Sequence, residues 1–293
     1  MKIAWFNDKR LGLVEGDRVH DVSAALTSLP GETYPGPWGD PLITHLDLVR
    51  DAIRAARATA PSIALTEACF HSPVARPSKI IGTPVNYLKH AEEAEQNRDV
   101  FAHRYQGGIE EQGLFLKAVS ALIGPADGVR VRFPQRRTDH EMELGVVIGR
   151  PAADITEADA LNYVGGYAIA LDMVVRGPED RSFRKSVDSY AVLGPWLVTA
   201  DEISDPGNLD FSLAVNGTVR QQSNTRFMIM SIARQIAWAS SFYTLWPGDI
   251  IMTGTCEGVG QVRPGDGMHC AIAGIGEMDV PVLGGERRSE ASP

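Results

Sequence analysis

Short apolar runs, each bounded by turn-forming residues, recur through most of the chain and limit the folds open to it. Turn pairs such as Asn216-Gly217 and Pro264-Gly265 lie beside several of these runs. Runs of this length are typical of β-strands, and they do not alternate regularly with helical segments as in a doubly wound sheet. We therefore expect an α+β protein that is predominantly β. The clearest runs are 79–82, 113–116, 141–148, 164–172, 196–199, 211–215, 249–253 and 268–272.

Three segments carry helical signals among these runs. Leu46, Val49 and Ile53 recur at the spacing of one helix face, which predicts an amphipathic helix that ends before Pro61. A second helix is expected over about 228–243. A third is expected to begin at Thr156, with Asp159 as its capping partner.

Loop-rich stretches suggest where the chain divides. A segment rich in Pro and Gly covers 30–41, and 72–77 resembles a linker. We therefore predict a small N-terminal α+β domain at 1–75 and a catalytic domain at 76–285. The polar residues 286–293 are expected to form a disordered tail.

Composition excludes several classes of partner. The formal net charge of -9 argues against binding to nucleic acid, because phosphate recognition needs a basic surface. No run of eighteen apolar residues exists, so we expect no membrane span. The N-terminus lacks the pattern of an export signal, and three scattered cysteines do not form a disulfide framework. These features favour a cytoplasmic protein.

Two glutamates in the run 141–148 are the first candidates for chemistry. Side chains alternate along a strand, so Glu141, Glu143 and Gly145 share one face, with the carboxylates about 7 Å apart. An isolated pair of this kind is often only a solvated strand face. Gly145 favours a functional reading, because a position without a side chain leaves room for a ligand, and neighbouring carboxylates repel unless a cation or proton intervenes.

Asp172 is the third carboxylate, and it closes the apolar segment 164–172. Burying it without a partner would be costly. A structural ion pair with Arg176 would satisfy it equally well. Together with the two glutamates, it would form an all-oxygen site of the kind preferred by Mg²⁺ or Mn²⁺.

Other residues could act beside such a metal. His90 and Glu93 lie on one face if their segment is helical, and the carboxylate would then orient the imidazole as a general base. Surface helices contain many such pairs. Lys185 could neutralise an enolate, although a solvated basic loop is the simpler interpretation. Thr255, in a small-residue loop after 249–253, could offer its hydroxyl and backbone N–H to a substrate carboxylate.

These fragments, in this order, resemble the fumarylacetoacetate hydrolase family over roughly 78–283. The resemblance rests on Asn86-Tyr87 with His90 and Glu93, 114–117, the two glutamates, 171–173 with Arg176, Lys185-Ser186, Gly194-Pro195, Asn216-Gly217 and 253–255. It implies a mixed β-roll with a small N-terminal domain, usually as a homodimer. It also implies Mg²⁺ or Mn²⁺ on Glu141, Glu143 and Asp172, and a lid that carries His90 and Glu93 as a water-activating pair. Lys185 and Thr255 match positions that contact substrate in relatives; Lys117 and Arg176 are further candidates for substrate binding.

The resemblance implies a metal-dependent hydrolase that cleaves a C–C bond in a small diketo acid through a metal-stabilised enolate. Catabolism of aromatic compounds or sugar acids would supply such an acid. An isomerase of 2-hydroxymuconate-type acids, or an oxaloacetate-type decarboxylase, could use the same site. A non-catalytic metal- or ligand-binding module is the alternative from a different class, and His90 beside the metal argues against it.

Overall fold

A large mixed sheet organises the chain, which the computed structural model describes except for residues 32–33, 97–107 and 286–293. The predicted disordered tail lies outside the described residues. Most neighbours in the sheet are antiparallel, while β16–β5 and β13–β7 are parallel. The strands, in spatial order, are β4 (Ser62–Ala64), β3 (Arg18–Asp21), β2 (Arg10–Glu15), β1 (Lys2–Phe6), β13 (Ala191–Thr199), β11 (Val164–Asp172), β10 (Met142–Ile148), β16 (Ile250–Met252), β5 (Ile80–Gly82) and β6 (Phe115–Lys117), with β7 (Leu122–Ile123) beside β13.

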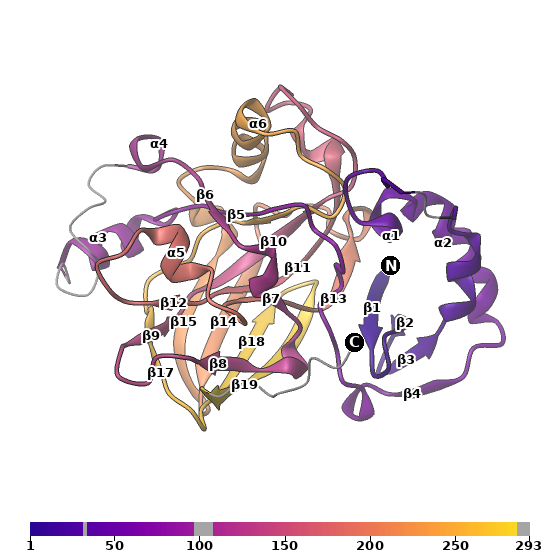
Figure 1. Cartoon of the computed structure of the whole chain (residues 1–293), viewed down its shortest axis with the longest axis horizontal. Helices are drawn as coiled ribbons and strands as arrows, with labels where there is room; N and C mark the ends of the chain where they lie inside the picture. Colours follow the sequence, from indigo (N-terminus) through magenta and orange to yellow (C-terminus); the bar gives the residue numbers. More distant parts are fainter. Residues whose placement is uncertain (32–33, 97–107, 286–293) are drawn as a thin grey trace.

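Two smaller sheets pack near the large one (Figure 1). One contains β15 (Thr218–Asn224), β14 (Asp210–Val215), β18 (Gly267–Ile272), β19 (Gly276–Gly284) and β8 (Val129–Val131). The other contains β12 (Val174–Val175), β9 (Thr138–His140) and β17 (Gly260–Val262). The predicted class, α+β with a predominance of β-structure, is confirmed.

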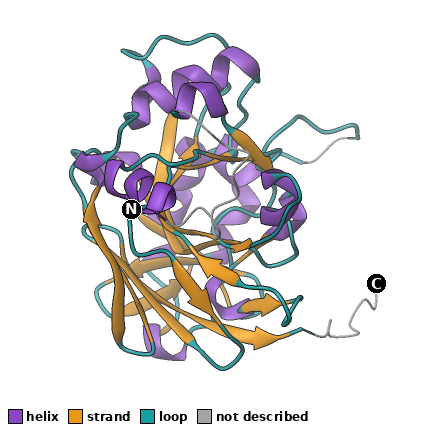
Figure 2. Ribbon diagram, turned by 90° about the vertical axis from the view of Figure 1, so that its left-hand side faces the viewer, coloured by secondary structure: helices purple, strands orange, loops and turns teal. Residues whose placement is uncertain are grey.

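Helices cover the sheets, and Figure 2 shows them gathered mainly toward the upper part of the view. Two of the three predicted helices are confirmed: α2 buries Leu46, Val49 and Ile53, and α6 begins after Ser231, whose hydroxyl accepts a hydrogen bond from the Arg234 backbone N–H. Among the described residues, no helix has both the length and the apolar character needed to cross a bilayer. The α-helices are α1 (Pro41–Thr44), α2 (Leu46–Arg57), α3 (Leu88–Gln96), α4 (Ile109–Gln112), α5 (Arg181–Lys185) and α6 (Ile232–Phe242).

The helix predicted to begin at Thr156 is wrong. The Thr156 hydroxyl does bond Asp159, but it closes a single turn, and only a short 3₁₀ segment (Ala160–Tyr163) follows. The chain must then enter β11 at Val164. Too few residues separate the cap from the strand for a helix to pay its nucleation cost. The other 3₁₀ segments are Ser23–Ser28, Leu65–Glu67, Val119–Ala121, Pro125–Asp127, Ala200–Glu202 and Thr225–Phe227.

The N-terminal region extends the large sheet instead of forming a separate one. β1 pairs with β13 through Lys2 opposite Val198 and Ile3 opposite Leu197. On the outer side of β1–β3, α2 packs its own apolar cluster, which includes Leu11, Val49 and Ile53. Figure 1 shows this region at one end of the molecule. A domain boundary at residue 75 stays a prediction.

The centre of the large sheet is covered on both faces. Every residue of β10 and of β13 is buried, which explains why these strands read as continuous apolar runs. In the antiparallel pair β10–β11, Met142 lies opposite Leu171 and Glu143 opposite Ala170. This register places Glu141, just before β10, beside Asp172 at the end of β11.

Candidate metal centre and active site

The register of β10 and β11 brings the three predicted carboxylates to one point. The backbone N–H of Asp172 donates to the Glu141 carbonyl at 2.9 Å, which fixes the two chain segments side by side. One carboxylate oxygen from each of Glu141, Glu143 and Asp172 lies within 4.8 Å of the others. The three residues are 6%, 2% and 1% exposed, so water screens their mutual repulsion little.

Two buried lysines face these carboxylates. Lys185, at the end of α5, donates from Nζ to Glu141 Oε2 at 2.5 Å and to Asp172 Oδ2 at 2.6 Å. Lys117, on β6, donates to the other oxygen of Asp172. Asp172 is therefore satisfied by lysines, and the alternative ion pair with Arg176 is not formed. Both lysines lie where a negatively charged oxo acid would approach the centre.

Arg176 supports Glu141 from the outer side. Its Nε donates to Asp139 Oδ2 at 2.7 Å, and its Nη2 donates to Glu141 Oε1 at 3.3 Å. Asp139 is fully buried and also accepts from Arg137 at 2.6 Å. Asp139 was not among the residues expected at the site; its place two residues before Glu141, on the same strand face, was the signal available. Substrate binding by Arg176 stays a prediction.

The charges act differently on the two glutamates. Burial alone would raise the pKa of Glu141, but the Lys185 ammonium, the Arg176 guanidinium and, less strongly, the nearby His90 imidazole outweigh it and lower the pKa to about 2. Burial and the neighbouring Asp172 carboxylate raise the pKa of Glu143 well above its usual range, and Lys185 only partly opposes them. A further positive charge at this point would keep all three carboxylates ionised.

The donor set fits a divalent cation. Three carboxylate oxygens within reach of one another form a hard, all-oxygen site, which favours Mg²⁺ or Mn²⁺ over a softer metal. Glu143 is further held by the backbone N–H of Gly254, which donates to its Oε2 at 2.7 Å. Gly254 has a φ of +96°, and a Cβ there would lie 2.5 Å from Asn86 Cβ. Only glycine therefore suits this contact.

His90 and Glu93 lie together on α3, as predicted. Nδ1 of His90 is 3.1 Å from Glu93 Oε2, and Oε1 of Glu93 accepts from the Gly258 backbone N–H at 3.1 Å. His90 is 5% exposed. With Nδ1 directed at a carboxylate, the tautomer that donates there makes Nε2 the acceptor nitrogen of the ring. The part of the chain just after α3 lies outside the described residues.

Thr255 belongs to a buried hydrogen-bond network that was not expected from the sequence. Its hydroxyl donates to the Met142 carbonyl at 2.7 Å and accepts from Gln221 Nε2 at the same distance. Gln221, from β15, also accepts from the Met142 N–H at 3.0 Å and contacts His140 Nδ1 at 3.0 Å. Because the Thr255 hydroxyl already donates to Met142 and accepts from Gln221, only its backbone N–H could donate to a substrate carboxylate as predicted.

Gly145 does not open space for a ligand, contrary to the sequence interpretation. A Cβ at this position would lie 2.7 Å from Cδ1 of Leu193 and 3.3 Å from Ala170 Cβ. The glycine is needed because β13 and β11 pack closely against this face of β10. The candidate metal centre therefore lies only at the end of the strand, at Glu141 and Glu143.

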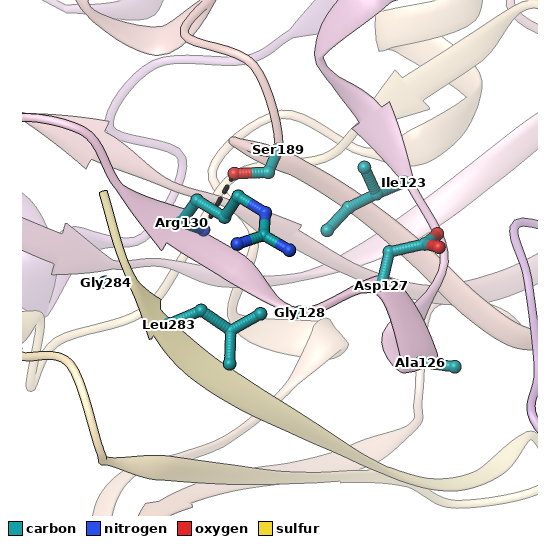
Figure 3. Close-up of a pocket in the computed structure, with 8 residues that line it drawn as sticks. All are labelled: Ile123, Ala126, Asp127, Gly128, Arg130, Ser189, Leu283 and Gly284. Atoms are coloured by element: carbon teal, nitrogen blue, oxygen red, sulfur yellow. Dashed lines mark hydrogen bonds between the residues drawn. The ribbon is translucent and has the colours of Figure 1, made fainter. Parts of the chain in front are cut away.

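A cavity of about 870 Å³ lies elsewhere, between β7, β8 and β19 (Figure 3). Arg130, Asp127 and Ser189 supply its polar lining, and the Ser189 hydroxyl accepts from the Arg130 backbone N–H. None of the three carboxylates of the metal centre lines it. The acidic centre, with its lysines and oriented imidazole, is therefore the stronger candidate for an active site.

Comparison with known proteins agrees with this geometry. The family model for the fumarylacetoacetate hydrolase C-terminal region matches residues 79–283. The chain belongs to the fumarylacetoacetate hydrolase family. The match contains every candidate residue of the site, from His90 to Thr255. The expected fold is confirmed by similarity to a solved maleylpyruvate hydrolase structure, with a TM-score of 0.82.

Several relatives of this family member are similar over nearly its whole length. A maleylpyruvate hydrolase from Aquipseudomonas alcaligenes is 50% identical, over 96% of this chain and 99% of the relative. The solved structure of a maleylpyruvate hydrolase from Sphingobium sp. SYK-6, in complex with manganese(II) and pyruvate, has 41% identity and a TM-score of 0.82, covering 98% of this chain and 100% of that one. A mitochondrial oxaloacetate tautomerase from Rattus norvegicus is 37% identical over 77% of this chain and 72% of the relative. The chain is an enzyme, and a divalent metal is its cofactor.

Proposed function

We propose that this enzyme hydrolyses a C–C bond in a small diketo acid of the maleylpyruvate type, with Mg²⁺ or Mn²⁺ held by Glu141, Glu143 and Asp172. The observation that carries the proposal is a buried carboxylate centre faced by two lysines. Identity of 50% to a maleylpyruvate hydrolase supports the reaction class. Such acids arise when aromatic rings are opened, so the reaction belongs to aromatic catabolism.

The residues around the centre suit an oxo-acid substrate. When bound, the divalent ion supplies a Lewis acid for the oxo and carboxylate oxygens of the substrate. Lys185 lies between Glu141 and Asp172 and would place a positive charge where negative charge develops as the C–C bond breaks. Lys117 would hold Asp172 in place and add a second positive charge to the site.

His90 would act as the general base. Glu93 fixes its Nδ1, so Nε2 can accept a proton from water as the oxygen attacks the distal carbonyl. The same proton can then be delivered to the carbon of the leaving pyruvate-type enolate. Glu93 itself is anchored by the Gly258 N–H, which would keep the imidazole oriented during the proton transfers.

Turnover of acylpyruvates tests the proposal directly. Purified enzyme supplied with Mn²⁺ or Mg²⁺ is expected to split maleylpyruvate or fumarylpyruvate into pyruvate and a diacid. Chelator treatment should abolish the reaction. Replacement of His90 by Ala is expected to reduce kcat by about 10²- to 10⁴-fold. Full turnover in chelated buffer would contradict the metal assignment, and full turnover by His90→Ala would contradict the role of the imidazole.

Isomerisation or decarboxylation is the second candidate, because the same enolate serves all three reactions. The similarity to an oxaloacetate tautomerase supports this reading. The ordered His90–Glu93 pair favours hydrolysis, since tautomerisation needs no activated water. Assays with oxaloacetate and 2-hydroxymuconate-type acids discriminate the two. Faster turnover of these acids than of acylpyruvates would favour the second candidate.

We further propose that the enzyme is a cytoplasmic homodimer. The three cysteines, Cys69, Cys256 and Cys270, are all free, which suits a reducing compartment. Large apolar side chains such as Phe183 and Phe242, 73% and 71% exposed, supply surface that an interface could cover. Light scattering during size-exclusion chromatography measures the mass, and a monomer across the micromolar range would contradict the dimer.

A further inference from the structure

Asn86 is a polar residue with no exposed surface, and the proposed reaction does not use it. It lies just beyond β5, which runs parallel to β16 with Gly82 opposite Met252. Parallel neighbours end at the same edge of a sheet, so the segments that follow these two strands leave it side by side. Asn86 therefore meets Thr253, the first residue after β16. Since β10 is antiparallel to β16, the first residues of β10 lie at this edge too.

The amide of Asn86 bonds two segments of the chain. Its Nδ2 donates to the Thr253 carbonyl at 2.8 Å and to the Met230 carbonyl at 3.0 Å. Its Oδ1 accepts from the Met230 backbone N–H at 2.7 Å. Both amide hydrogens and the amide oxygen are thus bonded, as buried polar groups require. Loss of the amide would remove a donor from the Thr253 carbonyl, which has no contact with water at this depth.

A single peptide group connects Asn86 to the carboxylate centre. The Thr253 carbonyl accepts from Asn86, and the N–H of the same peptide group is that of Gly254. This N–H donates to Glu143 Oε2 at 2.7 Å. In a trans peptide the C=O and the N–H point in opposite directions, so the two hydrogen bonds lie in series. Hydrogen bonds in series polarise and strengthen one another.

The Glu143 carboxylate depends on this peptide group more than its neighbours do. Lys185 donates to both Glu141 and Asp172. Among the residues that the structure describes, the Gly254 N–H is the only hydrogen-bond donor to the Glu143 carboxylate. The orientation of Glu143 is therefore set by the peptide group, and the orientation of the peptide group is set by the amide that bonds its carbonyl.

Close packing limits the positions that this peptide group can take. Gly254 has a φ of +96°, and a Cβ on it would lie 2.5 Å from Asn86 Cβ and 3.1 Å from the Thr83 carbonyl oxygen. On the other side, the Thr253 hydroxyl donates to the Leu144 carbonyl at 3.0 Å. A rotation that brought the Thr253 carbonyl to another donor would also turn the Gly254 N–H away from Glu143.

We propose that Asn86 is a positioning residue, which holds Glu143 in place as a metal ligand through the peptide group between Thr253 and Gly254. The inference rests on the proposed function, which makes Glu143 a metal ligand, and deepens it by naming the residue on which that ligand depends. The competing explanation is structural. The Asn86 carbonyl also accepts from the Ile229 N–H at 2.8 Å, so Asn86 would only tie the start of α3 to the segment before α6.

Two variants of Asn86 remove the donor in different ways. Asn86→Ala leaves a gap, whereas Asn86→Leu keeps nearly the same shape without any polar atom. Each should weaken Mn²⁺ binding by about 10-fold, since loss of a group that orients a metal ligand has an effect of this size. Calorimetric titration of the full chain with Mn²⁺ measures the affinity. The electron paramagnetic resonance spectrum of the bound ion should change as well, because a displaced carboxylate alters the symmetry around it.

Asn224→Ala is the matched control. Asn224 is 5% exposed, and its amide donates to Asp210 and accepts from the Arg226 backbone N–H. Within the described part of the chain it has no hydrogen bond to the three carboxylates. Asn224→Ala should lower thermal stability, as the Asn86 variants do, and leave both the Mn²⁺ affinity and the spectrum unchanged.

Three results would overturn the proposal. The first is an affinity of both Asn86 variants within about twofold of the wild type, whatever their stability. The second is an equal loss of affinity in Asn224→Ala, because affinity would then follow stability alone. The third is weak binding by Asn86→Ala with normal binding by Asn86→Leu, because packing would then matter and the donor would not. If one Asn86 variant does not fold, the other still gives the first two comparisons.

Titration of Glu143→Ala in parallel separates this inference from the proposed function. If Glu143→Ala binds Mn²⁺ as tightly as the wild type, the proposed ligand set fails. If Glu143→Ala loses the ion while both Asn86 variants keep wild-type affinity, the ligand set stands and only the role of Asn86 fails. Neither result depends on turnover of any substrate.

Discussion

Two regions of the molecule bury aspartate or glutamate side chains, and they satisfy them in opposite ways. Asp249 is fully buried, and its oxygens accept from the backbone N–H groups of Ser78, Lys79 and Trp246, each within 2.9 Å. The Lys79 ammonium neutralises it at 2.7 Å. The carboxylates of Glu141, Glu143 and Asp172 are instead crowded together. A carboxylate whose oxygens all accept from backbone N–H groups holds the chain in place. Several carboxylates close together repel one another, and a bound cation would relieve that repulsion.

Removing Glu143 is expected to have the largest effect. Glu143→Ala should abolish stoichiometric Mn²⁺ binding at micromolar concentrations and lower turnover more than about 10³-fold, because the ion would lose one of three charged ligands. The apo protein should keep its thermal stability, since the variant relieves repulsion at the centre. Calorimetric Mn²⁺ titration and thermal unfolding measure the two effects. A large loss of apo stability with metal binding intact would mean that Glu143 stabilises the fold, as Asp249 does, and does not bind the metal.

Asp249 should behave in the reverse manner. Asp249→Ala leaves several buried N–H groups and the Lys79 ammonium without their acceptor, so it should lower the free energy of unfolding by about 3–5 kcal/mol. Denaturant unfolding of the apo protein measures this loss. The folded fraction should bind Mn²⁺ with unchanged affinity, because Asp249 lies away from the three carboxylates. Weakened metal affinity in fully folded protein would show that the two regions are coupled.

The sequence predicts the clustering of the three carboxylates better than it predicts their surroundings. Strand alternation correctly placed Glu141 and Glu143 on one face, because that depends only on local geometry. The pairing of Asp172 with Lys117 depends on the order of strands across the sheet, which no local pattern specifies. Gly145 illustrates the same limit: its spacing is compatible with a ligand site or with close packing, and the Leu193 side chain decides between them.

Gln221 has features of both regions. It is a neutral, buried side chain that holds the backbone in place, and the segments that it holds surround the three carboxylates. Gln221→Ala would remove partners from His140, Met142 and Thr255 at once. We expect a loss of about 2–3 kcal/mol in unfolding free energy, with Mn²⁺ affinity about 10-fold weaker. The matched Gln221→Glu keeps the acceptor oxygen for Met142 but loses the amide donor to Thr255, so it should retain part of the stability and part of the affinity. Loss of stability alone, with affinity intact, would make Gln221 a purely structural residue.

Asp201 is an exposed carboxylate, and its replacement is expected to change the free energy of unfolding least. Hydrogen bonds from the Thr199 hydroxyl and the Arg50 guanidinium lower the pKa of Asp201 to about 2, from an ordinary value of 3.8. A depressed pKa means that the ionised form stabilises the fold above pH 3.8, and that this contribution fades as the pH falls toward 2.

The side chain of Asp201 is 54% exposed, so solvent screens the pair, and its contribution should be below about 1 kcal/mol. Asp201→Asn should therefore lower the free energy of unfolding slightly at pH 7. The difference from the wild type should shrink as the pH falls below 4, over the range in which both proteins remain folded. Denaturant unfolding at several pH values measures it. A difference that stayed constant with pH would mean that Asp201 contributes through packing or neutral hydrogen bonds, and that charge matters to stability only where it is buried.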